Sequence, residues 1–189
     1  MVMLFWSPSR EGQTGKNMRI LANILRIQYG AKICALHNYQ KAIPRIDQLQ
    51  KEAWEHVFLD CGNHLDPPVK SLFQSVDTVV VNLPQDEKII ASYFQERCHI
   101  RGKVFYLLNS SPVSFRDGER MCQNLFRMSE EECGAIPYNL RFEQYYEKNL
   151  GFFYQNQLLR RETYGMEREF AKKTCEIAVK LLKMNCLFK

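Results

Sequence analysis

Short apolar segments alternate along the chain with longer segments whose apolar residues recur at helical spacing. Apolar runs without polar alternation are typical of strands buried on both faces, and such strands followed by helices predict a parallel sheet. We therefore expect an α/β protein, a three-layer α/β/α fold with a mostly parallel sheet, formed by residues 1–189 as a single domain. The expected strands are Val2–Trp6, Lys32–Leu36, His56–Leu59, Thr78–Leu83, Lys103–Leu108 and Ala135–Tyr138, and the expected helices are Lys16–Gln28, Gln48–Glu55, Pro67–Gln74, Asp86–Cys98, Arg116–Arg127 and the amphipathic Thr163–Met184.

The loop after the first expected strand carries the strongest candidate chemistry, because parallel sheets bind ligands beyond the carboxyl ends of their strands. A phosphate site needs small residues that let backbone N–H groups converge, then a helix N-terminus and preferably a lysine. Gly12, Gly15 and Lys16 stand at these positions. Arg10 and Asn17 depart from the strict pattern G-x-x-x-x-G-K-[ST], so an ordinary polar turn is the alternative.

Composition narrows the class of protein. The chain is 46% hydrophobic, which is too apolar for a disordered protein. No apolar run approaches the ~20 residues of a membrane-spanning helix, and the N-terminal residues predict no signal peptide. The seven cysteines include no pair at Cys-x-x-Cys spacing, which suits buried thiols in a reducing compartment and predicts a cytoplasmic location.

The net charge of +5 is concentrated near the end of the chain, where residues 158–189 hold more Lys and Arg than Asp and Glu. The favoured interpretation is a closing helix with a solvated basic face. The segment Lys180–Lys189 also combines apolar residues with lysines, as interfacial membrane anchors do, and this second interpretation predicts a peripheral contact with a membrane surface. No specific nucleic acid is indicated as a partner.

The segments Glu11–Asn17, Trp54–Gly62, Val76–Pro84, Lys103–Asn109 and Ile136–Asn139 follow one another along the chain. Their order resembles the MinD/ParA-like branch, in the SIMIBI class, of P-loop ATPases. Where that family has a lysine-glycine-glycine-x-glycine-lysine-threonine loop, this chain has Glu11-Gly-Gln-Thr-Gly-Lys-Asn17. The family's apolar strand that ends in aspartate is similar to Trp54-Glu-His-Val-Phe-Leu-Asp-Cys-Gly62. The resemblance implies a P-loop NTPase-like fold, with a weakly structured stretch before the C-terminal helix. Three later segments match in order: Val76-Asp-Thr-Val-Val-Val-Asn-Leu-Pro84, Lys103-Val-Phe-Tyr-Leu-Leu-Asn109 and Ile136-Pro-Tyr-Asn139.

The same resemblance implies a site for ATP or ADP with Mg²⁺. Lys16 would neutralise phosphate oxygens, and Asp60 would hold Mg²⁺ through water, so these two are the candidate catalytic residues. Asn17 would join Asp60 at the metal, and Asn109 would border the adenine. The implied nucleotide-binding residues are Gly12, Gln13, Thr14, Gly15, Lys16, Asn17, Met18, Asn109, Pro137 and Tyr138.

Departures from the family pattern favour weak or absent ATPase activity. Glu11 replaces the signature lysine that reaches across the family's nucleotide-sandwiched dimer, which weakens the expectation of a homodimer. The acidic switch after the second strand is replaced by His37-Asn-Tyr-Gln40, which leaves no evident group to activate water. The chain thus resembles a compact and degenerate member, similar to atypical ParA-like proteins of pilus or partition localisation.

Three functions stay open. The first is adenine-nucleotide binding in spatial localisation, partition, or secretion and pilus assembly, with a protein partner from that apparatus. The second is a catalytically inactive, partner-binding scaffold of the same fold. The third is a flavodoxin-like reductase that binds FMN, because Ser7-Pro-Ser-Arg10 resembles the phosphate-binding start of that family.

Overall fold

Six strands form one sheet in the part of the chain that the computed structural model describes, which is residues 1–42, 54–96, 100–109 and 127–186 with isolated positions between them. The strand order is β2-β3-β1-β4-β5-β6, and every neighbouring pair is parallel. The predicted parallel α/β fold is therefore confirmed. The strands are β1 Val2–Trp6, β2 Ile33–Leu36, β3 His56–Asp60, β4 Thr78–Leu83, β5 Lys103–Leu108 and β6 Cys133–Ala135.

The strand order decides against the flavodoxin-like alternative. Flavodoxin-like sheets have the order 2-1-3-4-5, in which the first strand lies between the second and the third. Here β3 lies between β2 and β1, since β3 pairs with both. The fold expected for the FMN-binding reductase is therefore not the fold of this chain.

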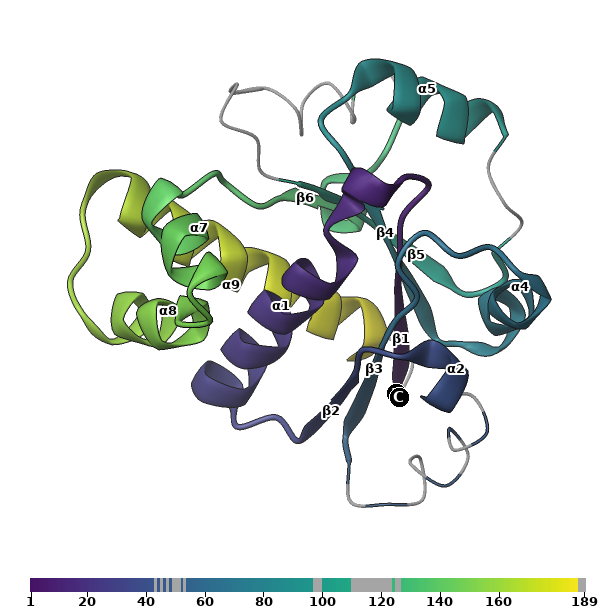
Figure 1. Ribbon diagram of the computed structural model, residues 1–189, viewed down its shortest axis with the longest axis horizontal. Helices are drawn as coiled ribbons and strands as arrows, with labels where there is room; N and C mark the ends of the chain where they lie inside the picture. The colour runs from purple at the N-terminus through teal and green to yellow at the C-terminus, as the bar shows by residue number, and fades with distance from the viewer. Residues whose placement is uncertain are drawn as a thin grey trace.

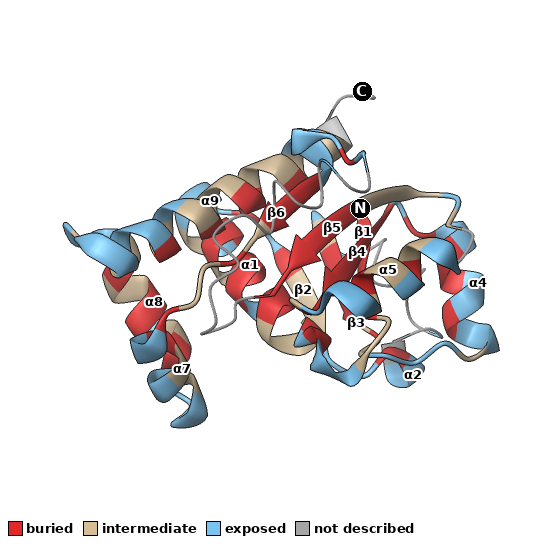
Figure 2. Ribbon diagram, turned by 90° about the horizontal axis from the view of Figure 1, so that it is seen from above, coloured by how far each residue is buried: buried red, intermediate tan, exposed pale blue. Residues whose placement is uncertain are grey.

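Helices cover both faces of the sheet (Figure 1). Seen from above, α1 and α9 lie on one side of the strands, and α2, α4 and α5 lie on the other (Figure 2). The predicted helix Arg116–Arg127 falls largely outside the described residues, as does half of the predicted helix Gln48–Glu55, whose described residues Trp54 and Glu55 are not helical. The helices are α1 Thr14–Tyr29, α2 Tyr39–Ala42, α4 Pro67–Ser75, α5 Glu87–Gln95, α7 Leu140–Glu147, α8 Gly151–Arg160 and α9 Gly165–Cys186, with 3-10 turns η1 Arg10–Gly12 and η3 Glu130–Glu132.

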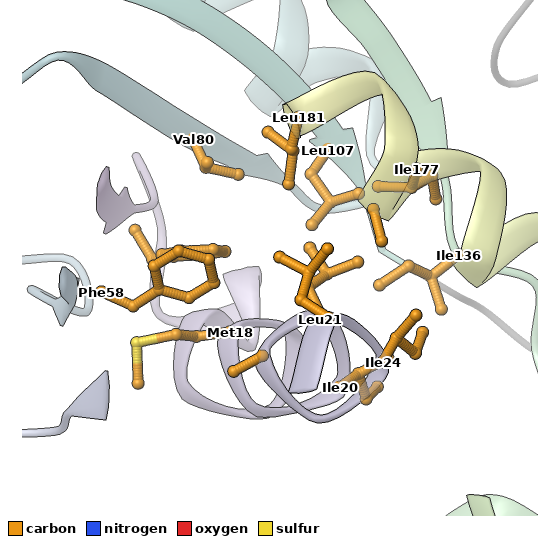
Figure 3. Close-up of a cluster of buried hydrophobic side chains, with 14 of the residues drawn as sticks. Met18, Ile20, Leu21, Ile24, Phe58, Val80, Leu107, Ile136, Ile177 and Leu181 are labelled. Carbon is orange, nitrogen blue, oxygen red and sulfur yellow. The ribbon is translucent and has the colours of Figure 1, made fainter. Parts of the chain in front are cut away.

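Alternate residues of β1 supply two separate cores, as the period of a strand requires. Leu4 and Trp6 pack with α4 and α5, whereas Met3 and Phe5 pack with α1 and α9. Figure 3 shows the second core, in which Leu21 of α1 lies among apolar side chains from the sheet and from α9. Burial of α1 on this core holds its first turn at the carboxyl ends of the strands. The labelled members are Met18, Ile20, Leu21, Ile24, Phe58, Val80, Leu107, Ile136, Ile177 and Leu181.

The ends of most predicted elements are close to those observed. Helix α1 ends at Tyr29 and is capped by Gly30, which takes a left-handed φ of 65° and whose N–H donates to the carbonyl of Leu25. The last strand is shorter than predicted and ends at Ala135, not Tyr138. Pro137 has no N–H group with which to extend a ladder.

The stretch before the C-terminal helix is not weakly structured, contrary to expectation. It forms α7 and α8, which lie beside each other and near α9 (Figure 1). Phe142 and Tyr146 are four residues apart, as are Tyr154 and Leu158, so each pair lies on one helix face. Each helix is too short for its apolar residues to repeat over several turns, so the sequence pattern does not predict it. Packing against α1 and α9 stabilises both helices.

Candidate functional site

The loop after β1 lies at the carboxyl end of the sheet, as predicted. The N–H of Ser7 donates to the carbonyl of Gly62 after β3, at 2.9 Å, which joins the loops after β1 and β3. Gln13 then takes a left-handed conformation, with φ 48° and ψ 33°, and turns the chain into α1. Gly12 passes so close to β1 that a Cβ there would lie 1.9 Å from Ser7 Oγ. The glycine is therefore required by the path of the backbone.

Asp60 stands at the end of β3 against the first turn of α1. Thr14 Oγ1 donates to Asp60 Oδ1 at 2.7 Å, and the N–H of Gly62 donates to the same oxygen at 3.0 Å. A Cβ on Gly15 would lie 2.6 Å from the other oxygen, Oδ2. The structure thus brings together Thr14, Gly15 and Asp60, three residues that were predicted from sequence. Oδ2 therefore faces Gly15 on one side and His37 on another, with Nδ1 of His37 at 3.8 Å.

His37 adds a group to this site that sequence reasoning left out. Its Nδ1 lies 3.8 Å from Asp60 Oδ2, and its Nε2 accepts from Arg19 Nε at 2.9 Å. Because arginine always carries its protons, Nε2 must be unprotonated, and the neutral ring holds its proton on Nδ1. Burial lowers the pKa of His37, and the charge of Arg19 lowers it further. The position of His37 directly after β2 was the signal that could have identified it.

A polar cavity of about 260 Å³ opens beside His37 and Asp60. It occupies the crevice outside the carboxyl ends of β2 and β3, which is where open parallel sheets bind their ligands. Cys61 faces it from a buried position, and burial raises the pKa of its thiol, so this thiol stays protonated. The cavity is lined by His37, Asn38, Tyr39, Gln40, Asp60, Cys61, Gly62 and His64.

The side chain of Asn17 lies in a buried network of amides. Its Nδ2 donates to Asn82 Oδ1 at 2.8 Å and to Asn109 Oδ1 at 2.5 Å. Asn109 Nδ2 donates in turn to the carbonyl of Glu11 at 3.1 Å. The network joins α1, β4, the end of β5 and η1, so it holds the loop in place. A single asparagine within the apolar strand Thr78–Leu83 was the sequence signal for Asn82.

Replacement of Asn17 by leucine is expected to lower the free energy of unfolding by about 2–3 kcal/mol, because two buried acceptors lose their donor. Chemical denaturation monitored by circular dichroism measures this loss. Gln28→Leu on the exposed side of the same helix is the control and should change stability by less than about 0.5 kcal/mol. Equal stability of the two variants would show that the amide network does not hold the loop.

Lys16, the predicted phosphate-binding lysine, forms an ion pair within the protein. Its Nζ donates to both carboxylate oxygens of Glu143 on α7, at 2.8 and 3.0 Å. The Lys16 side chain is only 9% exposed and that of Glu143 is 24% exposed. Sequence reasoning missed Glu143, because it lies on a helix that was not predicted and is far from the loop along the chain.

The remaining predicted residues occupy two places. The side chain of Met18 is fully buried beside Phe58, so only its backbone could reach a ligand (Figure 3). Pro137 and Tyr138 are half-buried and connect β6 to α7. Asn109 follows β5, the strand that pairs with β6, so these three residues share one edge of the site, although both ends of the Asn109 amide are engaged. Their contact with adenine stays a prediction.

The residues that the structure describes include no cluster of three or more His, Cys, Asp or Glu side chains arranged to hold a metal ion. Within the same part of the chain, no helix has the length and apolar character needed to cross a membrane. Leu181 is fully buried, and Lys180 Nζ donates to the carbonyls of Glu130 and Cys133, so the start of the predicted anchor packs on the protein.

The fold is that of P-loop NTPases of the MinD/ParA type, as solved structures show. The cell division ATPase MinD of Pyrococcus furiosus aligns with a TM-score of 0.68 at 10% identity, over 97% of this chain and 99% of that one. A ParA family ATPase from Chlorobium tepidum aligns at 0.66 and 9% identity, over 94% and 98%. The septum site-determining protein MinD of Pyrococcus horikoshii, complexed with Mg-ADP, aligns at 0.63 and 11% identity, over 99% and 98%. No protein-family model and no curated protein matches the sequence.

Proposed function

We propose that this protein binds ATP or ADP with Mg²⁺ in the loop of residues 12–17. The observation that carries the proposal is the joint position of Lys16, the glycine loop and Asp60 at the start of α1, in a fold shared with ATPases. One of those structures is described as a complex with Mg-ADP. Backbone N–H groups of the first helical turn are good ligands for a phosphate, and Lys16 supplies a cation.

Some of the predicted residues are suited to hold Mg²⁺ with a nucleotide, and others are not. Asp60 Oδ2 faces Gly15 and is suited to hold Mg²⁺ through water, with Thr14 already bonded to the other oxygen. Asn17 is less suited, because its amide is engaged in the buried network. Mg²⁺, when bound, supplies charge neutralisation for the phosphates. We propose weak or absent hydrolysis, since no carboxylate replaces the family's acidic switch at residues 37–40.

The biological role proposed is spatial localisation or partition, exerted through a protein partner. Its support is the fold shared with a cell division ATPase and a ParA family ATPase. A homodimer and a peripheral membrane contact through residues 180–189 belong to the same proposal and rest on the family resemblance.

Replacement of Lys16 by alanine is expected to weaken Mg-ATP binding by about 10- to 100-fold, because a charge-assisted contact to phosphate is lost. Isothermal titration calorimetry with ATP and ADP, with and without Mg²⁺, measures the affinity. Lys70→Ala on the exposed face of α4 is the matched control and should bind as the unchanged protein does. Equal affinities for all three proteins would refute the assignment of Lys16 to phosphate.

The Lys16–Glu143 ion pair favours a second candidate, the partner-binding scaffold that uses no nucleotide. In that case the lysine of the loop serves only to attach α7 to α1. The two candidates differ in one result of the titration. Measurable Mg-dependent binding supports the first candidate, and heat signals indistinguishable from dilution support the second.

A further inference from the structure

Lys16 and Glu143 lie far apart along the chain, and their contact attaches α7 to the start of α1. The Lys16 ammonium donates two hydrogen bonds to the carboxylate, at 2.8 and 3.0 Å, which place the carboxylate where an anionic ligand of Lys16 would lie. The lysine is nearly buried, so water screens the contact only slightly. The phosphate-binding cation of the loop is thus neutralised by the protein itself.

We propose that Glu143 is an internal competitor for the phosphate, so that a nucleotide binds only when α7 releases Lys16. This inference rests on the proposed function. A carboxylate that stayed in contact with Lys16 would stand beside the charged phosphate oxygens, and like charges repel strongly at such a distance away from bulk water. Phosphate and Glu143 therefore exclude each other, and binding is coupled to the position of α7.

The other contacts of α7 decide how firmly this helix is held once Glu143 releases Lys16. Asn139 caps the helix by accepting from the N–H of Phe142, and Pro137 and Tyr138 connect the cap to β6. On the outer surface, Arg141 pairs with Glu167 of α9 at 2.8 Å, but the arginine is largely exposed and such pairs contribute little. Loss of the Lys16 contact therefore removes a polar attachment of α7 to α1. The apolar contacts of α7 remain, with Phe142 buried against Phe170 of α9 and Tyr145 stacked on Tyr154 of α8.

The first experiment measures affinity by calorimetry with Mg-ATP, Mg-ADP and pyrophosphate as probes. Glu143→Gln is expected to bind each of them about three- to tenfold more tightly than the unchanged protein, because the competing charge is gone. Glu147→Gln is the control, since it removes the same charge from an exposed position one turn further along α7. Its affinity should stay within about twofold of the original value.

The second experiment measures hydrogen exchange of the backbone amides in residues 140–147, which reports on α7 whether or not a reaction occurs. Mg-ATP is expected to speed exchange in the unchanged protein. In Glu143→Gln, exchange is already faster without nucleotide, and ATP adds little to it. This pattern separates release of the helix from a simple change in charge.

The outcomes that overturn the inference are distinct from those that overturn the proposed function. Equal, measurable affinities of Glu143→Gln and the unchanged protein refute the competition and leave nucleotide binding intact. Tighter binding by Glu143→Gln with no change of α7 exchange on addition of ATP refutes the coupling. Absence of binding of every probe by every variant refutes the proposed function and, with it, the inference.

Discussion

Replacement of Gly12 by alanine is expected to lower the free energy of unfolding by about 3 kcal/mol. The added Cβ would lie 1.9 Å from Oγ and 2.1 Å from Cβ of Ser7, and 3.1 Å from the carbonyl oxygen of Asn82. Ser7 is itself buried, and its Cβ cannot move without its backbone. The loop must therefore shift away from the end of β1, which also disturbs the position of Lys16.

Thermal unfolding followed by circular dichroism measures this effect, and a loss of about 3 kcal/mol corresponds to a fall in melting temperature of about 6–12 °C. Gly15→Ala is the comparison within the same loop. Its Cβ would lie 2.6 Å from Asp60 Oδ2 and meets side-chain atoms but no backbone, and alanine has the higher helix propensity by about 1 kcal/mol. A smaller loss is expected there. An unchanged melting temperature for Gly12→Ala would mean that the loop does not lie against β1.

Replacement of Phe142 by alanine is expected to lower the free energy of unfolding by about 3–5 kcal/mol. The ring is fully buried and lies 4.9 Å from the ring of Phe170 on α9 and 5.8 Å from that of Tyr146, measured between centroids. Its removal leaves a cavity between α7 and α9. Since Phe142 precedes Glu143, the same change is expected to loosen the contact with Lys16.

Urea denaturation with circular dichroism detection measures the loss, and Tyr145→Ala is the matched control on α7. Tyr145 is 39% exposed and stacks on Tyr154 with centroids 4.7 Å apart, so its removal should cost only about 1 kcal/mol. Similar losses for the two variants would contradict the role of Phe142 as the buried attachment of α7. Nucleotide affinity of the Phe142 variant then shows whether a loosened α7 frees Lys16.

Most of the sheet could be predicted from the sequence, because its strands are unbroken apolar runs such as Thr78–Leu83, which is buried at every position. Helices whose apolar residues repeat over several turns were also predictable. The predicted Lys16–Gln28 and Thr163–Met184 correspond closely to the observed α1 and α9. The helices α7 and α8 were missed, because two apolar residues at a spacing of four do not separate a short helix from a loop. Their formation depends on burial against α1 and α9.

The candidate site was predicted in part. The loop of Gly12 to Lys16 and the carboxylate of Asp60 meet as expected, because both follow parallel strands that are neighbours in the sheet. The amides of Asn17 and Asn109 meet as well, but they bond to each other instead of facing a ligand. The local sequence predicts which polar side chains lie near the strand ends. It does not predict their hydrogen-bond partners, because these are distant along the chain.

By itself the sequence determined the layers of this protein and the position of its phosphate-type loop, since both follow from periodicity and from glycines next to a helix start. Only the tertiary structure decided what neutralises the lysine of that loop. Lys16 meets Glu143 because α7 folds back over the start of α1, and that approach depends on the packing of Phe142 on α9. Contacts between residues so distant along the chain have no local pattern, so they appear only once the core is assembled.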